Sequence, residues 1–183
     1  MVFINSIISI MDIYLTVEEK YLQAVEELNY GELPKSLQYF LEIISADPGY
    51  ARAHYQLGCI YHYQFKDYQT AGYHYKLCVE LDAKFPDVYQ HYLKLLITLK
   101  MHRLIDVIAE KALITPGVSE ARIYELLGLN AEKLFNFALA ENLYKKAELI
   151  TESKEDQGMV REHLERIRDK QKSKKKMIYA YQG

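Results

Sequence analysis

Two neighbouring segments decide the fold: residues 51–63 (ARAHYQLGCIYHY) and residues 67–81 (DYQTAGYHYKLCVEL). In both, apolar residues recur at intervals of three and four, which is typical of an amphipathic helix with one buried face. Phe65-Lys66-Asp67, between them, leaves room only for a tight turn. The stretch therefore predicts one helix–turn–helix unit.

This unit recurs along the chain. One position of the first helix returns at spacings of 34, 35 and 35 residues: Ala24, Gly58, Leu93 and Gly128. One position of the second helix returns at spacings of 35, 34 and 35: Ser36, Ala71, Ile105 and Ala140. Pro48, Pro86 and Pro116 stand between units, where proline cannot continue the preceding helix. The period predicts four repeats, at about 16–48, 49–85, 86–117 and 118–150.

The repeats resemble those of the tetratricopeptide repeat (TPR) family, over roughly residues 16–150. The second repeat carries the motif most fully, with Leu57, Gly58, Tyr61, Tyr68, Ala71, Tyr75 and, in the second alanine position, Cys78. The fourth repeat supplies Leu127, Gly128, Phe137, Ala140, Tyr144 and Ala147. The third repeat departs from the pattern, since Tyr92-Leu93 replaces Leu-Gly.

The resemblance implies an all-α fold, a right-handed α-solenoid of about four TPR-like helix pairs with a C-terminal capping helix. The motif residues are structural. Gly58 and Gly128 are expected where two helix backbones approach closely, so that larger side chains would overpack.

The two ends of the chain differ from the repeats. Residues 1–11 (MVFINSIISIM) are apolar, but no Lys or Arg precedes the apolar run and it is too short to span a bilayer. We therefore treat residues 1–15 as a separate N-terminal segment. Its apolar part is either an extra helix packed on the array or a stretch that precedes a true start at Met11. Residues 151–176 are predicted to form a charged capping helix with a thin apolar stripe of Met159, Leu164 and Ile167, followed by a flexible tail at 177–183.

The sequence offers no candidate catalytic residue. The six histidines lack metal-ligand spacing, and no phosphate-binding loop, nucleophile elbow or paired-carboxylate motif is present. We therefore expect no enzyme, no cofactor and no metal site. Cys59 and Cys78 are expected to be reduced thiols, which suits the cytoplasm.

The expected binding surface is the concave face of the array, because the resemblance implies that the first helix of each repeat lines it. Tyr and Arg are frequent anchors of protein interfaces. The predicted peptide-binding groove comprises Tyr21, Arg52, Tyr55, Cys59, His62, Gln90, Lys94, Arg122 and Glu125. In a competing interpretation, Tyr21 and Val25 only pack against the N-terminal segment.

The predicted function is a protein–protein interaction scaffold or chaperone-like adaptor that binds a peptide or helix of a partner protein. The architecture also resembles the small repeat chaperones of bacterial type III secretion. A co-chaperone role is not expected. Family members that hold the C-terminal carboxylate of heat-shock chaperones use a clamp of Lys, Asn, Asn, Lys and Arg. The corresponding positions of this sequence hold Tyr21, Val25, Gln56, Asp87 and His91.

The alternative is nucleic-acid or ribosome association through residues 166–176 (RIRDKQKSKKK), which carry seven basic residues and one acidic residue. A steep loss of binding with added salt would favour this alternative.

Overall fold

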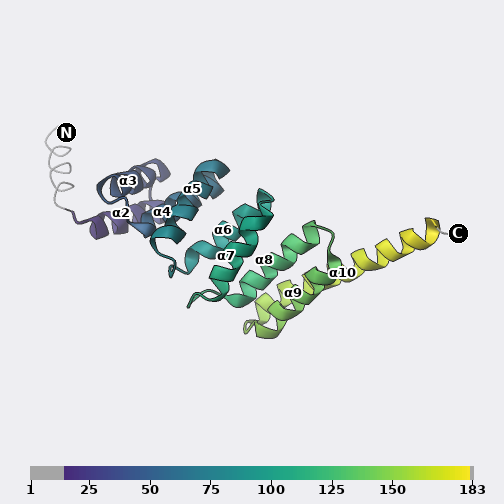
Figure 1. Ribbon diagram of the computed structural model, residues 1–183. Coiled ribbons are helices and arrows are strands. Elements are labelled where there is room, and N and C mark those ends of the chain that lie inside the picture. Colours follow the sequence, from purple (N-terminus) through teal and green to yellow (C-terminus); the bar gives the residue numbers. More distant parts are fainter. Residues whose placement is uncertain (1–14, 182–183) are drawn as a thin grey trace. The chain divides into compact units, whose positions relative to one another are not determined.

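The computed structural model describes residues 15–181, with side chains from 15 to 173. Within that range the elements are α2 (Val17–Tyr30), α3 (Leu33–Ala46), α4 (Ala51–Cys59), η1 (Ile60–Phe65), α5 (Tyr68–Leu81), α6 (Asp87–Thr98), α7 (His102–Leu113), α8 (Glu120–Lys133), α9 (Phe137–Ile150) and α10 (Lys154–Tyr181). The described residues contain no strand, which confirms the all-α prediction. Each of the four helix pairs lies inside one predicted repeat range (Figure 1).

Polar residues explain where the helices begin. The Thr16 hydroxyl accepts a hydrogen bond from the Glu19 backbone N–H while the Glu19 carboxylate accepts one from the Thr16 backbone N–H, a capping box at the start of α2. The Asp67 side chain caps α5 by accepting a hydrogen bond from the Thr70 backbone N–H. The Asn136 side chain caps α9 by accepting one from the Leu139 backbone N–H. These caps satisfy N–H groups that have no partner inside the helix.

The turns inside the repeats carry the same period in their backbone. Lys66, Lys100 and Phe135 all have φ near +57°, at spacings of 34 and 35 residues. Each stands in the turn between the two helices of its repeat. This left-handed conformation suits glycine and is unfavourable for a residue with a side chain.

The same contact between a glycine and a tyrosine recurs inside two of the repeats. A Cβ atom at Gly58 would lie 2.5 Å from the Tyr75 ring, and one at Gly128 would lie 2.6 Å from the Tyr144 ring. The sequence pattern predicts a second helix backbone at these positions. The structure instead places a fully buried tyrosine ring of the repeat's second helix against each glycine.

The chain forms two compact units, the first ending at Val88 and the second beginning at Tyr89. The first unit holds α2 to α5. One cluster of its core comprises Ala24, Phe40, Ile43, Ala53, Leu57 and Ile60. The predicted segment 1–15 falls almost wholly outside the described residues.

The second unit ends in α10, which packs on α9 and closes the last repeat. The core cluster around α9 and α10 comprises Ala131, Ala140, Tyr144, Ala147, Val160, Leu164 and Ile167. The predicted apolar stripe was wrong in one position, since Val160 is buried while Met159 is 43% exposed. The helix also continues to Tyr181, past the predicted bound at 176 and into the predicted flexible tail. Residues 182–183 lie outside the described part.

Candidate functional site

The predicted groove residues fall into two groups, one in each unit. In the first unit, Tyr21 belongs to α2, Arg52, Tyr55 and Cys59 to α4, and His62 to η1. Gln90, Lys94, Arg122 and Glu125 belong to the second unit, on α6 and α8.

In the first unit, polar contacts join the first helices of two successive repeats. The Gln56 amide donates to the Tyr21 hydroxyl at 3.3 Å, and Arg52 forms an ion pair with Glu18 at 3.2 Å. The Tyr21 ring packs against Phe40 and Tyr50, with centroids 5.8 and 5.4 Å away. Tyr21 is thus half-buried between repeats, whereas Arg52 is exposed.

Deeper in the same unit, Cys59 and His62 meet the side chain of Tyr75. The Tyr75 hydroxyl lies 3.5 Å from Cys59 Sγ and 3.3 Å from His62 Nδ1. His62 is only 7% exposed, and burial raises the pKa of the Tyr75 hydroxyl. Tyr55 packs edge-on against Phe85 at 5.1 Å and remains half-buried. Of this group, Tyr55 and Cys59 present some surface, while His62 is a core residue.

In the second unit, three predicted residues line one cavity of about 860 Å³: Gln90, Arg122 and Glu125. The remaining wall comes from the start of α8, the α9–α10 connection and the first turns of α10. It consists of Ser119, Glu120, Ala121, Ile150, Thr151, Glu152, Ser153, Asp156, Met159 and Val160. Lys94 lies one turn beyond Gln90 on α6, half-buried and outside this lining.

The cavity wall combines apolar and acidic groups. Met159 and Ile150 are both more than 40% exposed. Glu120 and Asp156 lie in the first turns of α8 and α10, where the helix dipole favours negative charge. A ligand of this cavity therefore meets apolar surface beside carboxylates.

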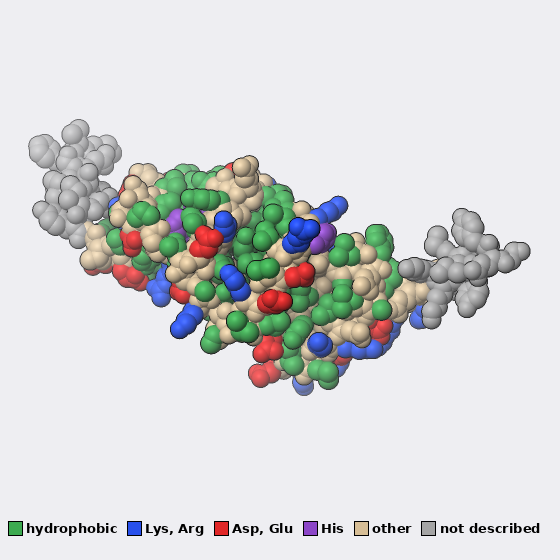
Figure 2. All heavy atoms as spheres, viewed as in Figure 1, with side chains coloured by type: hydrophobic (Ala, Val, Ile, Leu, Met, Phe, Trp, Pro, Cys, Tyr) green, Lys and Arg blue, Asp and Glu red, His purple; other side chains and the backbone are tan. Residues whose placement is uncertain are grey.

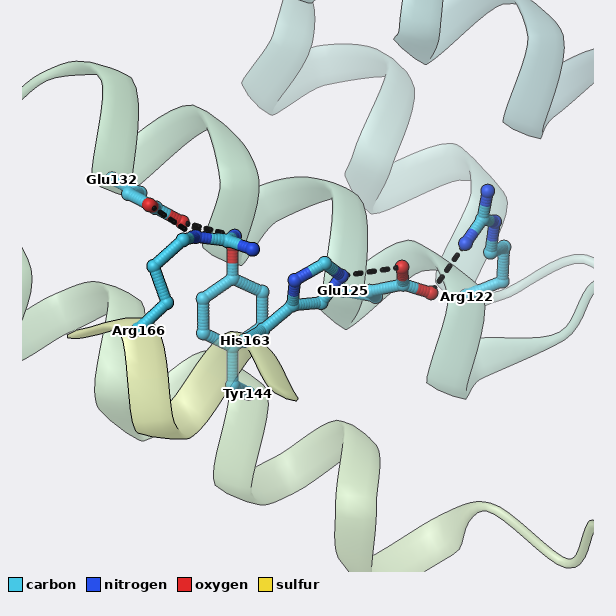
Figure 3. Close-up of polar contacts among 6 residues, drawn as sticks. All are labelled: Arg122, Glu125, Glu132, Tyr144, His163 and Arg166. Carbon is cyan, nitrogen blue, oxygen red and sulfur yellow. Dashed lines mark hydrogen bonds and ion pairs between the residues drawn. The ribbon is translucent and has the colours of Figure 1, made fainter. Parts of the chain in front are cut away.

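Glu125 is held between two helices (Figure 3). Arg122 forms an ion pair with it along α8, and His163 Nε2 on α10 lies 3.2 Å away. Burial alone would raise the pKa of Glu125, but the hydrogen bonds from His163 and Arg122 outweigh it and lower that pKa. Glu125 therefore serves mainly to attach α10.

A second ionic cluster fixes α10 farther along. The Glu132 carboxylate is 6% exposed and accepts two hydrogen bonds from the Arg166 guanidinium, both at 2.8 Å. Lys170 and the Tyr144 hydroxyl also donate to it, at 2.7 and 2.9 Å. Arg166 lowers the pKa of Glu132 to about 2 against the opposing effect of burial, with smaller contributions from the other two donors.

This cluster was not predicted from the sequence, where Arg166 and Lys170 read as part of a solvated basic tail. The available signal was the period, since Arg166 follows Glu132 by 34 residues and His163 follows Gly128 by 35. By this spacing, α10 corresponds to the first helix of a further repeat. Two of the seven basic residues of 166–176 are thus engaged with a buried carboxylate rather than available to nucleic acid.

Neither a metal site nor a membrane span is found in the described residues. No group of three or more His, Cys, Asp or Glu side chains there could hold a metal ion. Likewise, no helix in that part of the chain is long and apolar enough to cross a bilayer.

Comparisons with known proteins show the fold. No family model matches the sequence, and no curated protein matches it. A solved structure of Pseudomonas aeruginosa PilF aligns with a TM-score of 0.71 at 18% identity, covering 86% of this chain and 69% of that one. MamA from Desulfovibrio magneticus RS-1 aligns with a TM-score of 0.62 at 18% identity, covering 86% and 96%. PilW, described as a widely conserved type IV pilus biogenesis factor, aligns with a TM-score of 0.61 at 15% identity, covering 84% and 78%.

These neighbours are TPR helical solenoids. The chain therefore has the tetratricopeptide-repeat fold.

Proposed function

We propose that this protein is a binding module for another protein, and that the cavity between α8 and the start of α10 receives an extended peptide or a helix of the partner. The observation that carries the proposal is the cavity of about 860 Å³ that Gln90, Arg122 and Glu125 all line. Its volume falls in the range of pockets that enclose a ligand or a few side chains of a peptide.

The lining indicates what the partner presents there. Met159 and Ile150 offer apolar contact, while Glu120, Glu152 and Asp156 form a carboxylate rim. The Arg122 side chain is 33% exposed and already forms an ion pair with Glu125. A partner segment with an apolar side chain beside a Lys or Arg fits this wall better than an acidic one.

The first unit supports the same function with a second, separate surface. Arg52 is exposed, and Tyr55 is half-buried beside Phe85. Tyr and Arg at the edge of a packed cluster are the residue types that anchor interfaces. A holding role for unfolded cargo, as in chaperone-like adaptors, is the narrower form of this proposal.

Site-specific photo-crosslinking tests the proposal. A photoreactive amino acid at Met159 in the cavity should capture a partner in the native cell. The same group at Leu149, which is 84% exposed, should not capture that partner. The partner segment identified in the adduct is then synthesised and titrated against purified protein.

Two variants complete the test. Ala121→Arg fills the cavity and should weaken binding of that peptide by at least about tenfold, because a filled pocket excludes its anchor. Leu149→Arg should leave binding unchanged. Equal binding by both variants would refute the cavity as the site, and a steep salt dependence that survives Ala121→Arg would indicate the basic tail instead.

A further inference from the structure

The α6–α7 turn and the α8–α9 turn lie at the same edge of the second unit. Three residues join the helices of each pair, 99–101 in one and 134–136 in the other, so each pair is antiparallel. Helix α7 packs on α8, and residues 114–119 join these two helices at the opposite edge. Both turns therefore stand where α6 and α8 end (Figure 1). We call the surface formed by residues 99–103 and 133–136 the turn edge.

The tips of both turns expose apolar side chains. Leu99 and Met101 are 40% and 42% exposed, and Leu134 and Phe135 are 52% and 74% exposed. Phe135 also has a φ of 58°, a left-handed value that is strained for a bulky residue. Its largely exposed ring adds little to the core, so a strained backbone position holds an aromatic side chain in solvent. This arrangement favours a binding role.

The turn edge is also basic. Lys100, Arg103 and Lys133 are exposed. No Asp or Glu occurs at positions 99–105 or 133–140 of the sequence. Figure 2 shows Lys, Arg and His side chains beside apolar ones over the α6–α7 turn. Cations and apolar groups therefore share this surface.

Helix α10 brings further cations to the same level. The Gln171 side-chain amide donates to the carbonyl oxygen of Phe137 at 3.4 Å, which places this part of α10 beside the α8–α9 turn. Arg168 and Lys172 are exposed there. Asp169 is a carboxylate at this level, and it pairs with Lys172 at 3.6 Å.

The flank below the turn edge is mixed in charge. A second cavity, of about 870 Å³, lies between the α8–α9 turn and the middle of α10. Glu162, Glu165, Arg166 and Lys170 belong to its lining. Carboxylates offset the cations on this flank, so the positive excess belongs to the edge itself.

Acidic side chains gather at the opposite edge. Glu120 stands in the first turn of α8, Glu152 in the α9–α10 connection and Asp156 in the first turn of α10. The 14 residues of α8 separate the two edges by about 20 Å, at roughly 1.5 Å per residue. The second unit is therefore polarised, with its basic and apolar end away from the cavity of about 860 Å³.

We propose that the turn edge docks on the surface of an anionic lipid bilayer. Binding at a bilayer surface uses both components found here, because apolar side chains enter the headgroup region while Lys and Arg attract anionic lipids. A nucleic-acid backbone would use the cations but leave Leu99, Met101 and Leu134 in water. The cavity proposed for the protein partner lies at the opposite edge, so it stays open while the turn edge is docked.

A single tryptophan tests insertion, because the chain contains none. With vesicles of phosphatidylglycerol and phosphatidylcholine in equal parts, Phe135→Trp should shift its fluorescence to the blue and be quenched by brominated lipid. Leu149→Trp should show neither change, because Leu149 is 84% exposed near the end of α9, at the opposite edge. Vesicles of phosphatidylcholine alone should bind at least about tenfold more weakly.

A pair of charge variants tests the position of the surface. K100E/R103E should bind the mixed vesicles at least about tenfold more weakly, because it reverses two charges that face the bilayer. K111E/K154E changes the net charge by the same amount, at exposed positions near the opposite edge. It should bind like the wild type. Co-sedimentation of the full-length protein with vesicles measures both.

Three results would overturn the proposal. They are equal weakening by the two charge variants, an unshifted Phe135→Trp on mixed vesicles, or a wild type that binds polyuridylate RNA but no vesicles. The last result would assign the turn edge to nucleic acid. Ala121→Arg, which fills the cavity between α8 and α10, should bind vesicles like the wild type. Bilayer docking and the partner-binding function therefore succeed or fail separately.

Discussion

The Nδ1 atoms of His54 and His74 lie 3.0 Å apart inside the second repeat, where the two side chains are 4% and 5% exposed. His54 Nε2 lies 3.0 Å from the carbonyl oxygen of Pro48, which can only accept, so Nε2 carries the proton. His54 Nδ1 is then the acceptor, and His74 Nδ1 donates to it. The pair is satisfied when both rings are neutral, and a second proton would set two donors against each other.

We predict that the first unit loses stability as the pH falls from about 6.5 to 4. Burial, together with the neighbouring His54, lowers the pKa of His74 to about 4. In that window the unfolded chain binds a proton at this position and the folded chain does not, so acid favours unfolding. The loss should reach about 2–3 kcal/mol and is measured by urea unfolding with hydrogen exchange at α4 and α5 amides.

The control for this prediction is His74→Asn. An asparagine amide can still donate toward His54 Nδ1 but does not titrate. The variant should unfold with a flatter pH dependence between 6.5 and 4 than the wild type. An unchanged slope would mean that other groups determine the acid sensitivity.

A second prediction concerns the glycine–tyrosine contact. Gly58→Ala should destabilise the first unit by about 1–3 kcal/mol, because the new Cβ would lie 2.5 Å from the Tyr75 ring, which is fully buried and cannot withdraw. Gly158→Ala is the matched control, since no atom lies within 4 Å of its Cβ position on α10. It should stabilise by up to about 1 kcal/mol through helix propensity. Thermal unfolding of both variants measures these changes in stability. A Gly58→Ala variant as stable as the wild type would contradict the close contact with Tyr75.

The fold was predictable from the sequence because repetition makes each weak motif support the others. The third repeat, with Leu93 in place of glycine, still forms a helix pair, α6 and α7, inside its predicted range. Its identification came from the period and from Pro86 and Pro116, rather than from its own motif. Helix amphipathicity and turn position are local properties, so they are expressed directly in sequence spacing.

The candidate site was less predictable because it depends on side chains from different helices. Spacing along α8 places Arg122 and Glu125 on one face, but it does not show that His163 reaches Glu125 from α10. His62 illustrates the opposite error: its repeat position indicated a groove residue, yet its ring is buried against Tyr63 and Tyr75. Composition likewise assigned Arg166 to the basic tail. Its role depends instead on the buried carboxylate of Glu132, which composition does not reveal.

A third prediction uses the left-handed turns. Lys66 has φ 57° and an exposed side chain, so Lys66→Gly should stabilise the first unit by about 1 kcal/mol. Lys76→Gly, in the middle of α5, should destabilise by about the same amount, because glycine costs helix interiors conformational entropy. Equal effects of the two substitutions, measured by chemical denaturation, would show that the turn imposes no backbone strain.

The last prediction concerns the attachment of α10. Arg166→Met removes the bidentate partner of Glu132 and leaves a 6% exposed carboxylate with Lys170 and Tyr144 alone. We expect a loss of about 2–3 kcal/mol in the second unit, with faster hydrogen exchange along α10, because a buried charge is left partly compensated. Lys172→Met is the control: its partner Asp169 is 77% exposed, so that pair contributes little.

The double variant Glu132→Gln/Arg166→Met separates the charge from the packing. If the single variant is unstable because of an uncompensated carboxylate, removing that charge should recover part of the lost stability, and α10 exchange should slow again. If the double variant is less stable than Arg166→Met alone, the contribution of Glu132 lies in its bonds to Lys170 and Tyr144 instead. In either case α10 remains attached through Val160, Leu164 and Ile167, which pack into the core independently of the ionic cluster.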